Sequence, residues 1–157
     1  MAKPCTVAAA LCACAPAYAS GELGRAELPT KRHWYLRLER RDARPEHAEH
    51  FGQVHDEMLR MLSATAQGGE LRETLARQER LISNLSRASH SLRASGESRP
   101  RRIAALQAML RAGGELGALE RIAPPLPLPL DPTRPVEGVD AARAIVFKSA
   151  LSPLGLS

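Results

Sequence analysis

The chain has few of the side chains that usually fill a protein core or stack on nucleic-acid bases. Aromatic residues make up 3% of its 157 residues, and alanine supplies much of the hydrophobic 44%. Large core-filling side chains are therefore scarce, which predicts a weakly packed product. The net charge is +5, yet the one dense basic cluster (Arg99, Arg101 and Arg102) has no interleaved aromatic residues, so nucleic-acid binding is not expected. No hydrophobic run approaches the length of a membrane span.

Cysteine is also scarce and confined to one end. Cys5, Cys12 and Cys14 are an odd number, with no histidine nearby to complete a zinc site. The surrounding stretch has a lysine, an apolar middle and Ala-Tyr-Ala before Ser20, the shape of a secretory signal, although its hydrophobicity is weak. We expect residues 1–30 to be a disordered leader. A secreted small helical protein that begins at Ser20 is an alternative interpretation.

Three amphipathic helices are predicted in the middle of the chain. In the range 45–67 apolar residues recur at three- and four-residue steps, and Gly68 and Gly69 are expected to end that helix. A second helix has a near-heptad seam interrupted by Gln78 and Ser89; the seam consists of Leu71, Leu75, Ile82, Leu85 and Leu92. A third begins at Pro100 and closes at Gly113 and Gly114. Each apolar stripe requires a partner surface.

The composition changes at Ala123, where a proline-rich arm begins. Six prolines between Pro124 and Pro135 exclude helix and favour an extended arm. The leucines between them are expected to hold the arm to the rest of the protein. The range 143–148 is typical of a strand, Ser149–Pro153 of a turn, and Leu154–Leu156 of a returning strand. Gly155 occupies a position where a larger side chain is expected to strengthen that second strand. The sequence thus predicts a C-terminal β-hairpin.

Histidines and carboxylates gather in the first predicted helix. His47, His50 and His55 lie near helical spacing, but neither cysteine nor a suitable carboxylate arrangement accompanies them. We therefore expect surface histidines on a solvated face and predict no metal site. The neighbouring acidic residues indicate solvated charge and no catalytic pair; they are Glu46, Glu49, Asp56 and Glu57.

Several motifs follow one another along the chain. They begin with "HWYLRLE" at 33–39, the seam helix and "IAALQAML" at 103–110. They continue with "PLPLDP" at 127–132, Gly138 with Val139, and "FKSALSP" at 147–153. In this order the motifs resemble the class III phosphatidylinositol 3-kinases of the vacuolar protein-sorting type, and the proline block and the block at 147–153 are the specific ones. The resemblance runs from about Lys31 to Ser157.

The resemblance implies a mainly α chain: amphipathic helices, a proline-rich extended arm and the first β-hairpin of a kinase-like N-lobe, an incomplete α+β fold. Residues 1–30 are unmatched. Residues 31–67 would form the end of the accessory helical domain and residues 68–123 the helices that flank the N-lobe. Residues 124–157 would form the proline-rich arm and the first strands of the lipid-kinase catalytic domain.

The resemblance also implies that residues 147–153 form the phosphate-binding loop over ATP. In such a loop, backbone N–H groups and a small hydroxyl point at the β- and γ-phosphates. Ser149 is the expected phosphate contact and Lys148 has a general electrostatic role; the whole set is Phe147, Lys148, Ser149, Ala150, Leu151, Ser152 and Pro153. The strand lysine, the D-R-H-x-x-N loop and the D-F-G site of such kinases are absent from the 157 residues. We therefore expect a fragment that is inactive alone, with no catalytic residue and no tight binding of ATP.

The complete enzyme, by resemblance, would use ATP with Mg or Mn to phosphorylate the 3-hydroxyl of phosphatidylinositol. It would be cytoplasmic, at endosomal or autophagic membranes, with a regulatory protein-kinase-like subunit and other subunits of autophagy and endosome complexes. A rival interpretation is a helical and polyproline interaction module. Arg121, Pro124 and Pro127 fit the R-x-x-P-x-x-P pattern that binds Src-homology-3 domains.

Overall fold

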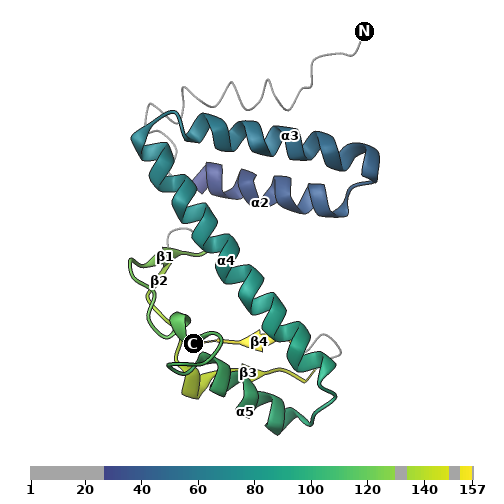
Figure 1. Cartoon of the computed structure of the whole chain (residues 1–157), viewed down its shortest axis with the longest axis vertical. Helices are drawn as coiled ribbons and strands as arrows, with labels where there is room; N and C mark the ends of the chain where they lie inside the picture. Colours follow the sequence, from purple (N-terminus) through teal and green to yellow (C-terminus); the bar gives the residue numbers. More distant parts are fainter. Residues whose placement is uncertain (1–26, 130–133, 149–152, 157) are drawn as a thin grey trace. The chain divides into compact units, whose positions relative to one another are not determined.

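The computed structural model describes residues 27–129, 134–148 and 153–156. This part of the chain is mainly helical, as predicted, with short 3-10 turns and two antiparallel ribbons of two strands each (Figure 1). It divides into two compact units. The helical-pair unit comprises the described residues up to Ala76 together with Pro129, and the hairpin unit comprises Arg77–Leu128 with the described residues from Arg134 onward. None of the described helices has the length and apolar character that crossing a bilayer requires.

The helical-pair unit is built on α2 (Glu27–Asp42) and α3 (Pro45–Leu62), which run antiparallel because only two residues join them (Figure 1). Proline at the first position of α3 suits a helix start, because its missing N–H has no intrahelical partner there. The two helices bury a small apolar cluster, which consists of Leu36, Val54 and Met58 with Phe51 and Leu59 at its edge.

The break between α3 and α4 (Ala66–Ala94) lies earlier than predicted. The α3 helix ends at Leu62, and the Thr65 hydroxyl accepts a hydrogen bond from the Gly68 N–H at 3.0 Å. Threonine in this position caps the start of the next helix. Gly68 and Gly69 therefore lie in the first turn of α4, and the prediction that they end the preceding helix was wrong.

The buried face of α4 follows the predicted seam except at Ile82. Leu71, Leu75 and Leu92 are buried as expected. Ile82 is 39% exposed, however, and its neighbour Leu81 is 8% exposed and belongs to the core. Gln78, expected to interrupt the seam, is fully buried because its amide has a partner on the proline-rich arm.

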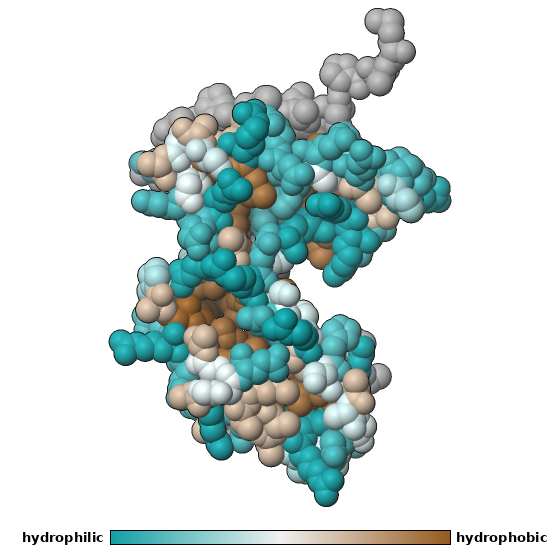
Figure 2. Space-filling view, viewed as in Figure 1, coloured by the Kyte–Doolittle hydropathy of each residue, from teal (hydrophilic) through white to brown (hydrophobic). Residues whose placement is uncertain are grey.

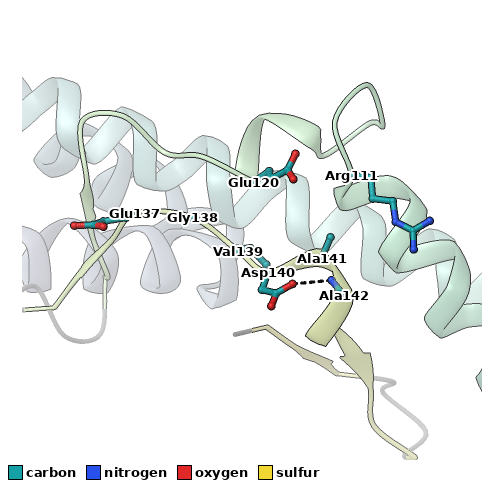
Figure 3. Close-up of a pocket in the computed structure, with 8 residues that line it drawn as sticks. All are labelled: Arg111, Glu120, Glu137, Gly138, Val139, Asp140, Ala141 and Ala142. Atoms are coloured by element: carbon teal, nitrogen blue, oxygen red, sulfur yellow. Dashed lines mark hydrogen bonds between the residues drawn. The ribbon is translucent and has the colours of Figure 1, made fainter.

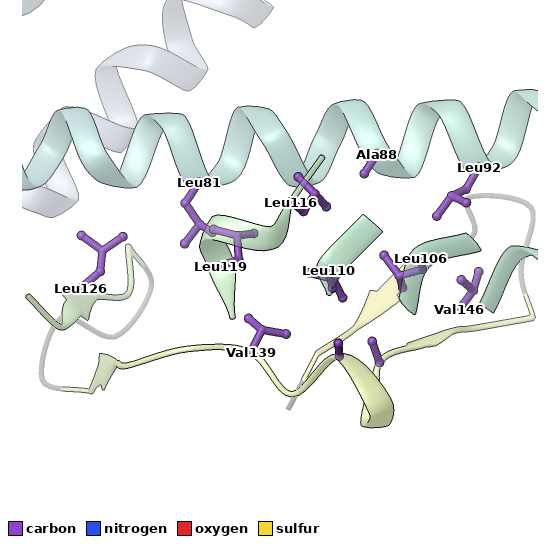
Figure 4. Close-up of a cluster of buried hydrophobic side chains, with 12 residues drawn as sticks. Leu81, Ala88, Leu92, Leu106, Leu110, Leu116, Leu119, Leu126, Val139 and Val146 are labelled. Atoms are coloured by element: carbon purple, nitrogen blue, oxygen red, sulfur yellow. The ribbon is translucent and has the colours of Figure 1, made fainter. Parts of the chain in front are cut away.

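The hairpin unit contains the larger core, which is formed without aromatic side chains. The second half of α4 packs against α5 (Arg99–Leu110), the 3-10 turn η1 (Gly117–Leu119) and the extended segments that follow (Figure 4). The third predicted helix is confirmed as α5, with Pro100 in its first turn. The core consists of Leu81, Ala88, Leu92, Leu106, Leu110, Leu116, Leu119, Leu126, Val139, Ala141, Ala144 and Val146.

The described residues of the proline-rich arm include extended strand, as predicted, and this strand forms a β-ribbon. Strand β1 (Leu126–Pro127) pairs antiparallel with β2 (Pro135–Val136). Leu126 is 2% exposed, so this leucine does hold the arm to the core. The 3-10 turn η2 (Ala141–Arg143) then leads into the C-terminal hairpin of β3 (Ile145–Val146) and β4 (Leu154–Gly155), whose first strand is shorter than predicted.

A pair of buried histidines joins the two helices of the helical-pair unit. His33 of α2 is 1% exposed, His55 of α3 is 5% exposed, and His55 Nε2 lies 2.9 Å from His33 Nδ1. Burial, followed by the neighbouring His55 and Arg37, lowers the pKa of His33 to about 4. The expectation that His55 lies on a solvated face was therefore wrong: its side of α3 is the side that packs on α2.

Most of the surface is hydrophilic on the face that Figure 2 shows. Apolar side chains gather there in a few patches, the most continuous of which lies over the hairpin unit. Among the described residues, the exposed large apolar side chains include two on the C-terminal hairpin, Ile145 and Phe147.

Candidate functional site: the C-terminal hairpin and its supports

The stem of the C-terminal hairpin consists of three consecutive residue pairs. Ile145 faces Gly155 and Val146 faces Leu154 in antiparallel register. The Phe147 N–H then donates to the Pro153 carbonyl at 3.0 Å. The stem therefore brings Phe147 and Pro153, the two ends of the predicted phosphate loop, together.

The two faces of β3 have opposite environments, as the two-residue period of a strand requires. Val146 is fully buried in the core, whereas Ile145 is 37% and Phe147 49% exposed. A β-carbon placed on Gly155 would lie 2.7 Å from Ile145 Cγ1 and 2.9 Å from the Phe147 ring. Glycine at this position leaves room for both side chains, so the expectation that a larger residue strengthens this strand was wrong.

The side chain of Arg99 holds the stem to α5. Arg99 is the first residue of that helix, and its Nε–H donates to the Val146 carbonyl at 2.8 Å. The two residues are 47 positions apart in the sequence. This bond satisfies a strand carbonyl immediately before the loop, and it places a permanent positive charge beside the stem.

Gln107 holds the segment that enters the stem. Its Nε2 donates to the Ala142 carbonyl at 3.1 Å and to the Ala144 carbonyl at 3.2 Å. The Asp140 carboxylate accepts from the Ala142 N–H at 2.9 Å and caps η2. One side chain of α5 therefore fixes a carbonyl within the turn and the carbonyl directly after it.

The segment before η2 is fixed by its own backbone against the chain that follows η1. The Val139 N–H donates to the Leu119 carbonyl at 2.9 Å, and the Ile122 N–H donates to the Glu137 carbonyl at 2.7 Å. A β-carbon on Gly138 would lie 2.3 Å from the Glu120 carbonyl oxygen. Only glycine permits this approach, which gives a physical reason for the glycine of the Gly138–Val139 motif.

The proline-rich arm is tied to α4 within the same unit. Gln78 Nε2 donates to the Pro127 carbonyl at 2.7 Å, and the Arg77 guanidinium donates to the Pro124 carbonyl. Gln78 and Pro127 are separated by 49 positions. These bonds fix the arm that precedes the hairpin, and they use carbonyls of the R-x-x-P-x-x-P pattern.

A cavity of about 530 Å³ opens beside residues 137–142, the segment that leads into the C-terminal hairpin (Figure 3). Three carboxylates and one guanidinium are among its lining residues: Glu120, Glu137, Asp140 and Arg111. Figure 3 shows Asp140 turned toward the Ala142 N–H. An excess of carboxylates repels phosphate groups, so this cavity does not suit a nucleotide phosphate.

The structure tests the predicted site residues only in part. Phe147 and Pro153 are brought together at the top of the stem, and Lys148 is exposed beside them. Ser149, Ala150, Leu151 and Ser152 lie outside the described residues. Their contact with ATP stays a prediction.

Three supporting residues were missed at the sequence level: Arg99, Gln107 and Gln78. Each donates to a backbone carbonyl 35 or more positions away. No periodic pattern marks such long-range bonds. The only available signal was a polar residue on an apolar helix face, which Gln78 gave when it interrupted the seam.

Comparison with known proteins adds a relative to this geometry. Over 124 residues, 79% of the chain, the sequence is 32% identical to phosphatidylinositol 3-kinase pik3 of Schizosaccharomyces pombe. The chain is similar to a phosphatidylinositol 3-kinase. The matched segment covers 15% of the length of the yeast protein. No family model matches the chain.

Proposed function

We propose that residues 31–157 correspond to the part of a class III phosphatidylinositol 3-kinase where the helical domain leads into the catalytic domain. The C-terminal hairpin carries its ATP-phosphate loop at residues 147–153. The complete enzyme transfers the γ-phosphate of ATP, with Mg or Mn, to the 3-hydroxyl of phosphatidylinositol. It acts at endosomal or autophagic membranes beside a regulatory protein-kinase-like subunit.

One observation carries the proposal: the most specific motif of the sequence occupies a β-hairpin whose stem is closed and anchored. The Phe147–Pro153 hydrogen bond joins the two ends of "FKSALSP", and Val146 is buried at its base. A loop that holds phosphate requires ends fixed by a rigid scaffold, since preorganised amides bind an anion at low entropic cost. The similarity to the yeast lipid kinase supports the same function.

The chemistry assigned to the loop is electrostatic. In phosphoryl transfer the protein positions the phosphates and neutralises their charge. Ser149 supplies a hydroxyl donor for a phosphate oxygen, and Lys148 supplies an exposed positive charge next to it. The catalytic strand lysine, the catalytic loop and the metal-binding aspartate of such kinases do not occur among the 157 residues.

The rival polyproline function fits the geometry less well. A Src-homology-3 domain binds a free polyproline helix. Here Leu126 is buried in the core, and the carbonyls of Pro124 and Pro127 accept hydrogen bonds from α4. Such a domain would have to compete with these contacts. The secretory interpretation rests on residues 1–20, which lie outside the described residues.

A grafted enzyme tests the proposal. Residues 31–157 replace the matching segment of the yeast kinase, and phosphorylation of phosphatidylinositol is measured with ATP varied. The graft is expected to be active. In the graft, Ser149→Ala removes a hydrogen bond to a charged group, which is worth about 1.5–3 kcal/mol, so kcat/KM for ATP should fall about tenfold or more.

Ser86→Ala is the matched control, because it removes a hydroxyl from an exposed position of α4 that lies outside the phosphate loop. Its kcat/KM for ATP should stay within about twofold of the parent graft. A folded graft without activity would contradict the proposed function. Equal effects of the two serine variants would contradict the role of Ser149.

A further inference from the structure

The base of the C-terminal hairpin is short, and an anchor from outside the hairpin fixes it. The strands β3 and β4 have two residues each. An isolated two-stranded hairpin is marginally stable in water. The position of its loop therefore depends on the contacts that the stem makes with the rest of the hairpin unit.

Arg99 makes a polar contact with the strand residue directly before the loop. Its Nε–H donates to the Val146 carbonyl at 2.8 Å, one residue before the Phe147 N–H donates to the Pro153 carbonyl. The two bonds lie on successive residues of one strand. Whatever loosens the Val146 carbonyl loosens the pair of residues at which the loop begins and ends.

The neighbouring arginine of the same cluster has a different role. Arg101 NH1 pairs with the Glu97 carboxylate at 3.0 Å, four residues earlier, and both side chains are largely exposed. Such an exposed ion pair contributes little to stability. Arg99 thus differs from Arg101 in its partner, a backbone carbonyl on a different element.

We propose that Arg99 is a positioning residue of the hairpin: the hydrogen bond from its Nε–H to the Val146 carbonyl holds the stem of the phosphate loop in place. The consequence for nucleotide binding rests on the proposed function. A loop whose ends are fixed loses less conformational freedom when phosphate binds, so the bond raises affinity for ATP without touching it.

Side-chain chemistry allows the hydrogen bond to be separated from the charge. The Nε2 donor of a glutamine follows the same three side-chain carbons as the Nε of an arginine, so Arg99→Gln keeps a donor at that reach and removes the charge. Arg99→Met has similar length and neither donor nor charge. Arg101→Met is the matched control, because it removes a guanidinium from the same helix without touching the hairpin.

The first readout needs no nucleotide and uses the full chain. Amide hydrogen exchange of Phe147 reports opening of the bond to the Pro153 carbonyl. Arg99→Met should speed this exchange about fivefold, as expected for one hydrogen bond of about 1 kcal/mol. Arg99→Gln and Arg101→Met should leave the exchange within about twofold of the parent.

The second readout uses the grafted lipid kinase. Arg99→Met should lower kcat/KM for ATP about fivefold and leave KM for phosphatidylinositol unchanged. Arg99→Gln should restore most of the loss. If Arg99→Met only lowered the stability of the graft, the kinetic parameters for ATP and for phosphatidylinositol would change together, and Arg99→Gln would not restore them.

The two readouts fail separately. The positioning role is overturned if the amide exchange of Phe147 is unchanged in Arg99→Met. It is also overturned if Arg99→Gln speeds this exchange as much as Arg99→Met does. An active graft whose ATP kinetics ignore Arg99→Met also overturns it. A folded parent graft without activity contradicts the proposed function instead, and the exchange experiment then still decides whether Arg99 positions the stem.

Discussion

The two units of the chain are stabilised in different ways. The helical-pair unit buries a small apolar cluster and, beside it, the side chains of Thr30, His33 and His55. Among the residues that the structure describes, the hairpin unit buries twelve apolar residues in its core, and side-chain amides and a guanidinium donate to carbonyls of its extended segments. The first unit is thus sensitive to protonation, and the second to loss of packing or of single donors.

This difference follows from the elements that each unit must hold. Two antiparallel helices satisfy their own backbone hydrogen bonds, so their interface has to supply only packing. The extended segments of the hairpin unit pair over two residues each and leave other carbonyls without a strand partner. Donors from the helices fill this need, and they also fix the position of the candidate site.

The largest expected effect is a core truncation in the hairpin unit. Leu106 of α5 is fully buried, so Leu106→Ala should lower the free energy of unfolding by about 2–5 kcal/mol. Urea denaturation followed by residue-resolved hydrogen exchange checks this, with the loss concentrated in the hairpin unit. Leu38→Ala, at a position that is 47% exposed, is the control. Equal losses for the two variants would contradict the assigned core.

Acid should weaken the helical-pair unit next. His33 has a pKa of about 4 when folded against the usual 6.5, so below pH 6.5 the unfolded chain binds a proton that the folded chain does not. Above pH 6.5 His33 is neutral in both states and does not change the free energy of unfolding. As the pH drops from 6.5 to 4, the free energy of unfolding falls. The loss reaches about 3 kcal/mol by pH 4, because the pKa difference of His33 is about 2.5 units and each unit is worth about 1.4 kcal/mol.

Urea midpoints measured across this pH range check the histidine prediction. The variant His33→Gln lacks the group and should show a flatter dependence on pH. His90→Gln, which changes a histidine outside the buried pair, should keep the dependence of the parent chain. A parallel pH dependence for His33→Gln and the parent would contradict the buried-histidine account.

A smaller effect is expected from the amide that ties the arm to α4. Gln78→Leu keeps the buried volume but leaves the Pro127 carbonyl without this donor, which should cost about 1–3 kcal/mol. Chemical denaturation measures the loss. Gln53→Leu, an exposed glutamine of α3, should change stability by less than about 0.5 kcal/mol. An unchanged midpoint in Gln78→Leu would show that the arm is held by packing alone.

Local patterns predicted α3, α4, α5 and the hairpin, because these depend on residues close in sequence, but they did not predict α2, whose first residues at 27–30 fall in the range expected to be a disordered leader. Pro100 marked the start of α5, and the β-branched run at 143–148 marked the first strand of the hairpin. Errors arose where a side chain has a distant partner. Gln78 can be buried because its amide donates to the Pro127 carbonyl. His55 can be buried because its ring nitrogen has a hydrogen-bond partner in His33. Periodicity contains no information on either partner.

The candidate site was predicted in the same uneven way. The motif at 147–153 was found from its residue types, and the structure closes its ends through the Phe147–Pro153 bond. The supports of the stem were missed, because Arg99 looked like part of a solvated basic cluster. Gly155 was expected to weaken its strand because the sequence around it does not show that the side chains of Ile145 and Phe147, from the other side of the hairpin, occupy the space beside it.

The activity of the grafted lipid kinase is the most direct test of the central claim. If residues 31–157 carry the entrance to a phosphatidylinositol 3-kinase catalytic domain, the graft phosphorylates phosphatidylinositol at the 3-hydroxyl, and Ser149→Ala lowers its kcat/KM for ATP about tenfold or more. A folded graft without activity, or an active graft whose kcat/KM for ATP is unchanged by Ser149→Ala, would contradict this claim.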